Sequence, residues 1–343
     1  MSRLTTWPLN RKQTADLLRD WPVGELMFLR EAAGSASPAV IVITRRGQYF
    51  LKQRSPRDSD PSRLSYDHSL MRHLARAGLP VVPALRTLEG SRWMRDKERV
   101  YEVYPWVDGE PFDPTSPEQL RAAAELLARL HQATEGFRPS GRKDLPRLFD
   151  PRDRLPELAE ARTLLEEGVS PGEVPPEQAR RILDLLEAEA RGVLKRVPDE
   201  RYWALPQVIV HGDYHAANLK YQEGQIVGLF DWDWACRQAR LKDVADGIIF
   251  FACPRERPLA GDIVALTQPP LYDEERIRAF LAAYEAHLPL TKEERACLPD
   301  LLRERWLYMR LDAMHRKVER EEKLRYLLEG VEGPLEWMGT WGK

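Results

Sequence analysis

Residues 208–219 have the sequence VIVHGDYHAANL, and residues 226–233 have the sequence IVGLFDWD. Each stretch begins with an apolar run typical of a strand and ends in polar residues. A rigid element that ends in polar side chains can hold a reactive group in a fixed place. We therefore expect the two stretches to bring Asp213, Asn218 and Asp231 together at the ends of two strands.

The spacing of these three residues fits phosphoryl transfer. That reaction needs a carboxylate near the acceptor hydroxyl and oxygen ligands for Mg²⁺, which bridges the phosphates of the nucleotide. Asn218 follows Asp213 by five residues, as the Asn follows the Asp in the protein-kinase loop H-R-D-x-x-x-x-N. Asp231 comes after a short hairpin, in the place of the metal-binding Asp of D-F-G.

The motif H-G-D-x-x-x-x-N, followed by a strand and D-W-D, resembles the aminoglycoside phosphotransferase and choline kinase family. Members of this family are small-molecule kinases with a protein-kinase-like fold, and the resemblance extends from about residue 29 to residue 251. It implies ATP and Mg²⁺ as cofactors and a hydroxyl of a small molecule as the acceptor. The acceptor stays open between an aminoglycoside, an amino alcohol, an amino acid and a sugar.

The resemblance also implies roles for single residues. Asp213 corresponds to the catalytic base, and Asn218 and Asp231 correspond to the magnesium ligands. Lys52, at the end of a predicted strand, corresponds to the lysine that holds the nucleotide phosphates. In the family a helix glutamate pairs with that lysine, and Asp67 is the best match for it here, although its side chain is one methylene shorter.

Two further segments are expected to contact the nucleotide. Gly34 and Ser35 correspond to the loop that covers the phosphates, although this loop has few glycines. Tyr104 and Trp106 fall where the hinge between the lobes meets the adenine, mainly through backbone groups. These four residues complete the predicted nucleotide site.

The patterns around these motifs divide the chain into two parts. Residues 40–44 and 49–52 predict a hairpin, residues 66–77 a helix and residues 100–107 another strand. After about residue 113 the apolar spacing is helical, and a last helix over residues 301–328 is expected to bury one apolar face and to turn its charged residues to solvent. We therefore predict an α+β, two-lobed, protein-kinase-like fold. The small β-rich N-lobe spans residues 1–104, and the larger, mainly helical C-lobe spans residues 105–343.

The composition of the chain indicates which partners and which cellular compartment to expect. The chain has 343 residues, with 52 Lys and Arg against 54 Asp and Glu, so the net charge of −2 disfavours a nucleic-acid partner. The longest strongly apolar stretch is too short to span a membrane. Three cysteines without a C-x-x-C motif indicate reduced thiols and a cytoplasmic protein. The oligomeric state is not specified by the sequence.

Two alternatives to a kinase remain. His211, Asp213 and His215 could ligate a transition metal in a metal-dependent phosphoesterase, although such a site needs further ligands. A kinase-like binding or structural protein with weak catalysis is the other alternative. The role of Asp233 is also open, since it could line the acceptor site, assist with metal or face solvent.

Overall fold

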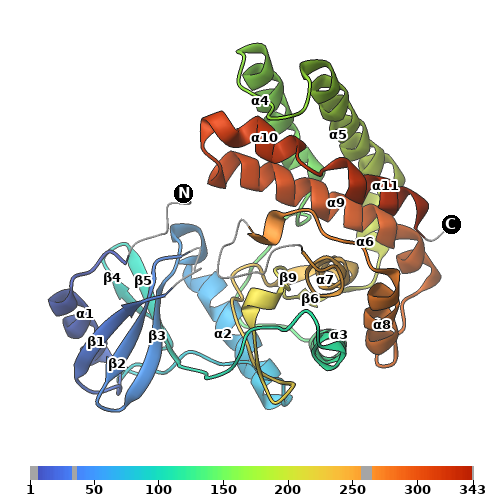
Figure 1. Cartoon of the computed structure of the whole chain (residues 1–343). Helices are drawn as coiled ribbons and strands as arrows, with labels where there is room; N and C mark the ends of the chain where they lie inside the picture. Colours follow the sequence, from blue (N-terminus) through green and yellow to red (C-terminus); the bar gives the residue numbers. More distant parts are fainter. Residues whose placement is uncertain (1–6, 33–36, 256–264, 342–343) are drawn as a thin grey trace.

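The computed structural model describes residues 7–32, 37–255 and 265–341. Figure 1 shows a twisted sheet on one side of the molecule and a larger group of helices on the other. The predicted α+β, two-lobed architecture is confirmed. Among the described helices, none is both long and apolar enough to cross a lipid bilayer.

The N-lobe contains one antiparallel sheet with the strand order β1-β2-β3-β5-β4. Its strands are β1 (Leu26–Glu31), β2 (Ala39–Thr44), β3 (Gly47–Gln53), β4 (Met94–Asp96) and β5 (Arg99–Pro105), and helix α1 (Arg11–Leu17) precedes them. The predicted hairpin is confirmed as β2 and β3. The sheet continues into β5, which ends next to the predicted lobe junction between residues 104 and 105; that junction stays a prediction.

Strand β3 directs its side chains to two different environments. Leu51 is fully buried in the N-lobe core with Tyr101 and Val103 of β5. Because side chains alternate along a strand, Lys52 and Arg54 point to the opposite face. This alternation sends two neighbouring cations from the sheet toward the C-lobe.

Helix α2 (Pro61–Arg76) lies between the sheet and the C-lobe in Figure 1. It begins five residues before the predicted start, because Asp60 caps the amides of residues 62 and 63 and Pro61 occupies the first turn. Asp67 and His68 are buried within it. The helix therefore presents polar groups to the interior.

The C-lobe is built from helices that pack around a large apolar core, and a second, smaller apolar cluster contains Phe149 and Val210. The helices are α3 (Pro117–Thr134), α4 (Leu155–Glu166), α5 (Pro176–Arg196), α6 (Asp199–Ala204), α7 (Leu241–Gly247), α8 (Glu274–Glu285), α9 (Lys292–Lys317), α10 (Lys323–Leu328) and α11 (Glu332–Thr340). Helix α3 packs on α8, and α9 packs on α5 and α7. In Figure 1, α4, α5, α9, α10 and α11 form the upper part of the lobe.

Helix α9 corrects two expectations about the end of the chain. It begins at Lys292, after a capping box formed by Thr291 and Glu294, and it ends at Lys317, so the predicted helix over residues 301–328 is really α9 and α10. The expectation that its charged residues face solvent is wrong for Glu304, Arg305 and Arg310, which are buried. Ion pairs inside the lobe replace water around Glu304 and Arg305, as the Arg305–Asp246 pair does, and backbone carbonyl groups replace it around Arg310.

Two short hairpin-like ladders carry the motifs quoted first. Strand β6 (Gln207–Val210) pairs with β9 (Cys236–Ala239), and β7 (Leu219–Gln222) pairs with β8 (Gln225–Leu229). The two predicted strands correspond to β6 and β8, which pair with β9 and β7 rather than with each other. Residues 211–218 connect β6 to β7, and residues 231–233 follow β8 after the single residue Phe230.

Candidate active site

Asp243 of α7 holds the backbone of the loop that follows β6. Its carboxylate accepts hydrogen bonds from the backbone amides of His211 (2.6 Å) and Gly212 (2.9 Å), and it lies 3.1 Å from Nε2 of His131. Gly212 has a φ of +79°, and a Cβ there would lie 2.6 Å from the carbonyl oxygen of Trp234. Only glycine fits this turn without strain, and the two hydrogen bonds to Asp243 hold the backbone before Asp213 in this conformation.

Asp213 is held between two basic side chains. One carboxylate oxygen lies 3.2 Å from Nε2 of His215, and the other lies 3.8 Å from Nη2 of Arg305. Burial alone would raise the pKa of Asp213, but the charges of His215 and Arg305 outweigh it and lower the pKa to about 2. Asp213 is therefore an anion throughout the neutral range.

Asn218 contacts the backbone of Asp213, and Asp231 follows a residue that contacts Asn218. The amide nitrogen Nδ2 of Asn218 donates to the carbonyl oxygen of Asp213 (2.9 Å), which leaves Oδ1 as an acceptor. The amide of Phe230 donates to the carbonyl oxygen of Asn218 (3.0 Å), so Asp231 follows directly beside it. Asp231 has a φ of +62°, and its side chain is 37% exposed. An amide oxygen and an accessible carboxylate suit a divalent cation that prefers oxygen ligands.

Lys52 points at the residues after β8. Its Nζ donates to Oδ1 of Asp231 (3.0 Å) and to Oδ2 of Asp233 (2.9 Å). Burial would lower the pKa of Lys52, but these two carboxylates raise it above the ordinary value. The site thus places a charged ammonium beside the candidate metal ligands.

Asp67 does not pair with Lys52 in the structure, contrary to the expectation from the sequence. Its Oδ2 accepts from Nη2 of Arg54 (2.5 Å), and its Oδ1 accepts from Nζ of Lys143 (2.7 Å). The longer arginine, two residues after Lys52 on the same face, reaches the short aspartate. A contact of Asp67 with the nucleotide site remains a prediction.

The other predicted nucleotide residues are placed as follows. The hydroxyl of Tyr104 donates to Oε2 of Glu102 (2.7 Å), and Nε1 of Trp106 donates to Asp108 (2.8 Å). Both side chains are therefore engaged within the protein, and a hinge role through the backbone stays a prediction. Gly34 and Ser35 lie outside the described residues.

Sequence reasoning missed the residues that complete this charged cluster. Arg54 could have been found from its position two residues after Lys52, because strand residues at that spacing share a face. Lys143 comes from the connection between α3 and α4, and Arg305 comes from α9. No local pattern marks either of them, since only the fold brings them to the site.

The geometry of His211 bears on the phosphoesterase alternative. Its Nε2 lies 2.8 Å from the carbonyl oxygen of Phe230, and its Nδ1 accepts from the amide of Asp213 (3.3 Å). Both ring nitrogens are thus used within the loop, which leaves none for a metal. In the part of the chain that the structure describes, no group of three metal-ligating side chains is assembled.

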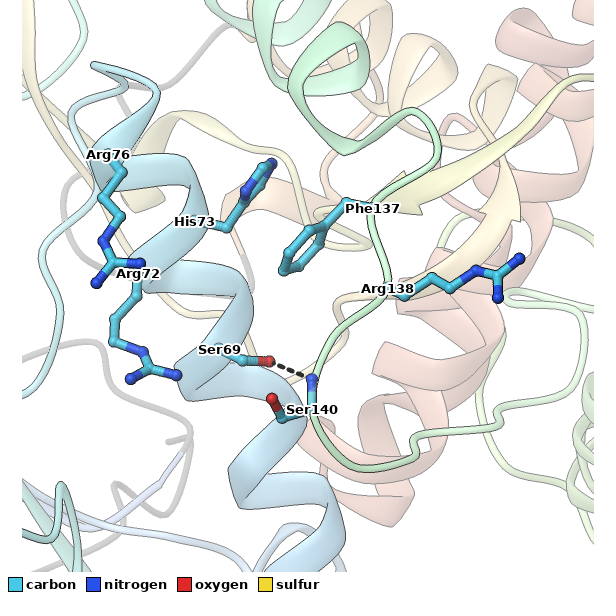
Figure 2. Close-up of a pocket in the computed structure, with 7 residues that line it drawn as sticks. All are labelled: Ser69, Arg72, His73, Arg76, Phe137, Arg138 and Ser140. Atoms are coloured by element: carbon cyan, nitrogen blue, oxygen red, sulfur yellow. Dashed lines mark hydrogen bonds between the residues drawn. The ribbon is translucent and has the colours of Figure 1, made fainter.

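A separate pocket of about 170 Å³ lies against α2 and contains none of the predicted site residues (Figure 2). His73 and Phe137 stack in it with ring centroids 3.8 Å apart, and the amide of Ser140 donates to Ser69 (2.8 Å). Figure 2 shows Arg138 directed away from Arg72 and Arg76 of α2, so the arginines of this pocket do not converge.

Known proteins resemble this chain over most of its length. The sequence model of the phosphotransferase enzyme family (APH) matches residues 29–280. The homoserine kinase of Methylobacillus flagellatus is 27% identical over 304 residues, which cover 88% of this chain and 83% of that protein.

Two solved structures share the fold. The amicoumacin kinase hAmiN, in complex with AMP-PNP, Ca²⁺ and Ami, has a TM-score of 0.66 at 15% identity and covers 96% of this chain and 92% of its own. A microcompartment-associated aminopropanol kinase has a TM-score of 0.62 at 14% identity and covers 96% and 97% of the two chains. This chain therefore belongs to the phosphotransferase enzyme family and is a kinase that transfers phosphate from ATP to a hydroxyl of a small molecule.

Proposed function

We propose that this kinase uses Mg·ATP to phosphorylate the side-chain hydroxyl of a small amino acid of the homoserine type. The similarity to a homoserine kinase over most of both chains supports this acceptor class. The observation that carries the proposal is the position of Arg305, whose guanidinium lies 3.8 Å from the carboxylate of Asp213. A cation beside the catalytic base suits an acceptor that carries a carboxylate.

The proposed roles at the reacting end follow from the contacts. Asp213 orients the acceptor hydroxyl and accepts its proton, and Lys52 neutralises charge on the phosphates. A carboxylate with a pKa of about 2 is a weak base, so its main work is orientation, with proton transfer late in the reaction. Asn218 and Asp231 would hold Mg²⁺, which when bound neutralises the charge on the phosphates.

Arg305 has donors left for the acceptor. Its Nε is paired with Asp246, while among the described residues neither terminal nitrogen donates a hydrogen bond. A guanidinium edge with two free donors matches a carboxylate in geometry and charge. We therefore assign the carboxylate of the acceptor to Arg305.

The aromatic residues nearby do not form a cage for an ammonium ligand. The guanidinium carbon of Arg305 lies 3.9 Å from the ring centroid of Phe149 and 5.2 Å from that of Phe250. These rings already contact a cation, so they are not free to bind choline through cation–π contacts. An amino acid acceptor fits this environment better than choline or an aminoglycoside.

The test compares L-homoserine with 3-amino-1-propanol, which is homoserine without its carboxyl group. ADP release is measured for both with Mg·ATP, and the phosphate ester is identified by ³¹P NMR. We expect kcat/KM for homoserine to be higher by roughly 10–100-fold, the scale of one lost charge-assisted hydrogen bond. Equal kcat/KM values, or a preference for an aminoglycoside, would contradict the proposed acceptor.

A variant tests the assignment to Arg305 separately. Arg305→Gln should reduce kcat/KM for homoserine much more than for 3-amino-1-propanol, so that the preference between them disappears. Arg316→Gln is the matched control, since Arg316 lies on the same helix in an exposed ion pair with Asp312. A loss of the same size for both acceptors would show that Arg305 acts on Asp213 alone.

We also propose a cytoplasmic location. All three cysteines, Cys236, Cys253 and Cys297, are free and buried, as in proteins of reducing compartments. Fractionation of cells that produce the protein, with a periplasmic marker and a cytoplasmic marker, tests this. Recovery with the periplasmic marker would contradict it.

A further inference from the structure

The segment after β8 contains two carboxylates that differ in accessibility. The side chain of Asp231 is 37% exposed, whereas that of Asp233 is 12% exposed. Both oxygens of Asp233 are engaged, Oδ2 by Nζ of Lys52 (2.9 Å) and Oδ1 by Nη1 of Arg54 (2.7 Å). Asp233 therefore has no free oxygen for a metal, while Asp231 remains accessible.

Arg54 connects this segment to helix α2. Its Nη2 is bound to Asp67 of the helix, and its Nη1 is bound to Asp233. The side chain of Arg54 is almost fully buried, so both contacts are shielded from water. The result is a chain of ion pairs that runs from Asp67 through Arg54 and Asp233 to Lys52.

We propose that Asp233 is the positioning residue for Lys52, in place of a carboxylate on helix α2. Arg54 fixes the orientation of the Asp233 carboxylate, and that carboxylate holds the ammonium of Lys52 at the end of β3. If Asp231 binds a divalent metal, Lys52 loses one carboxylate partner and keeps Asp233. The inference rests on the proposed role of Lys52 in binding the nucleotide phosphates.

The charges of the cluster show what a neutral group at position 233 would remove. Lys52, Arg54 and Lys143 face the carboxylates of Asp67, Asp231 and Asp233. Without Asp233, Arg54 and Lys52 have one carboxylate fewer in a buried place. Lys52 would then pair with Asp231 alone, and Asp231 is the residue proposed to bind the metal.

The experiment measures Mg·ADP binding by calorimetry, which needs no turnover. Asp233→Asn should weaken binding by roughly tenfold or more, the effect of losing a charge-assisted contact, while KM for the acceptor stays the same. Asp67→Asn tests the rival carboxylate on helix α2, because it removes the other carboxylate on Arg54 and leaves Lys52 paired with Asp233. Asp67→Asn should change the Kd by less than about threefold, even if it lowers Tm as much as Asp233→Asn does.

Lys52→Met separates the possible failures. If this variant loses nucleotide affinity while Asp233→Asn binds like the wild type, the inference about Asp233 is overturned and the role of Lys52 stands. If Asp67→Asn weakens binding as much as Asp233→Asn, helix α2 positions Lys52 and the inference is also overturned. If Lys52→Met binds Mg·ADP normally, the proposed role of Lys52 fails, and the inference falls with it.

A second measurement does not depend on the folding of the Asp233 variant. Without Mg²⁺, ADP binding to Asp231→Asn should equal binding to the wild type, because Asp233 still holds Lys52. A loss of metal-free ADP binding equal to that of Lys52→Met would mean that Asp231 positions the lysine, and it would overturn the inference.

Discussion

Arg54 and Asp67 form a buried ion pair in which Nη2 of the arginine lies 2.5 Å from Oδ2 of the aspartate. The pair joins β3 to helix α2, and Lys143 of the C-lobe binds the second oxygen of the same carboxylate. Arg54 also binds Asp233, so the arginine joins β3 to α2 and to the segment after β8. Removing it should affect stability as well as the site.

Arg54→Met should lower the free energy of unfolding by about 3–5 kcal/mol, since it leaves Asp67 and Asp233 short of a buried partner. Urea unfolding followed by circular dichroism measures the change. The same substitution at Arg45 is the control, because Arg45 and Glu25 form a pair whose side chains are 73% and 71% exposed. That variant should lose at most about 1 kcal/mol, and equal losses at the two positions would contradict the buried network.

Asp213→Asn should lower kcat by about 10²–10⁴-fold, because it removes the group that orients and deprotonates the acceptor hydroxyl. Nucleotide binding should be nearly intact, since Asp213 contacts His215 and Arg305 and makes no contact with Lys52 among the described residues. Steady-state kinetics and the Kd of Mg·ADP give the two quantities. Wild-type turnover would exclude Asp213 as the base.

Gly212→Ala should distort the loop that carries Asp213 and lower kcat on the order of 10²-fold, because a new Cβ would lie 2.6 Å from the backbone of Trp234. Gly224→Ala is the matched control. Gly224 has nearly the same positive φ of +77°, but nothing lies within 4 Å of a Cβ there. It should cost only about 1–2 kcal/mol of stability and leave kcat unchanged, so similar kcat values for the two variants would refute the steric argument.

Glu102 should contribute a pH-dependent part of the stability. Burial would raise its pKa, but Arg54 and His68 outweigh burial and lower the pKa from 4.5 to about 2. A carboxylate with a lowered folded-state pKa stabilises the protein above its unfolded pKa, and the benefit is lost as the pH falls through the folded-state value. The shift corresponds to about 3 kcal/mol at neutral pH.

The test compares wild type and Glu102→Gln by urea unfolding at pH 6 and pH 3. Between pH 6 and pH 3 the free energy of unfolding should fall by about 2 kcal/mol more in the wild type than in the variant. This pH interval covers most of the range between the ordinary pKa of Glu102, 4.5, and its folded-state pKa of about 2. Equal losses would mean that Glu102 is not held as an anion by its neighbours.

The sequence allowed the catalytic loop to be predicted because its information is local. Asp213 and Asn218 are five residues apart, and Asn218 contacts the backbone of Asp213 directly. Asp231 is reached by one short hairpin, β7 and β8, so few conformations separate it from the loop. The two-lobed fold followed from the strand-rich start and helical end of the chain for the same reason.

The ion-pair partners could not be predicted, because they depend on contacts between distant segments. Asp67 and Lys143 are 76 residues apart, and Lys52 and Asp233 are 181 residues apart. Spacing also could not indicate that Arg305 is buried, since the charged residues of α9 have the composition of an exposed helix. Only the packing of α9 on α7 brings Arg305 to Asp213.

The bridge from Asp67 through Arg54 to Asp233 has a consequence for protein engineering. A glutamate introduced at position 67 to pair directly with Lys52 would still attract Arg54, so the two cations would compete for its carboxylate. Arg54 and Asp233 would then have to be exchanged in the same step, since each buried charge balances the next. Because the charge of each residue balances that of the next, a graft of this bridge into another kinase should carry all three residues together.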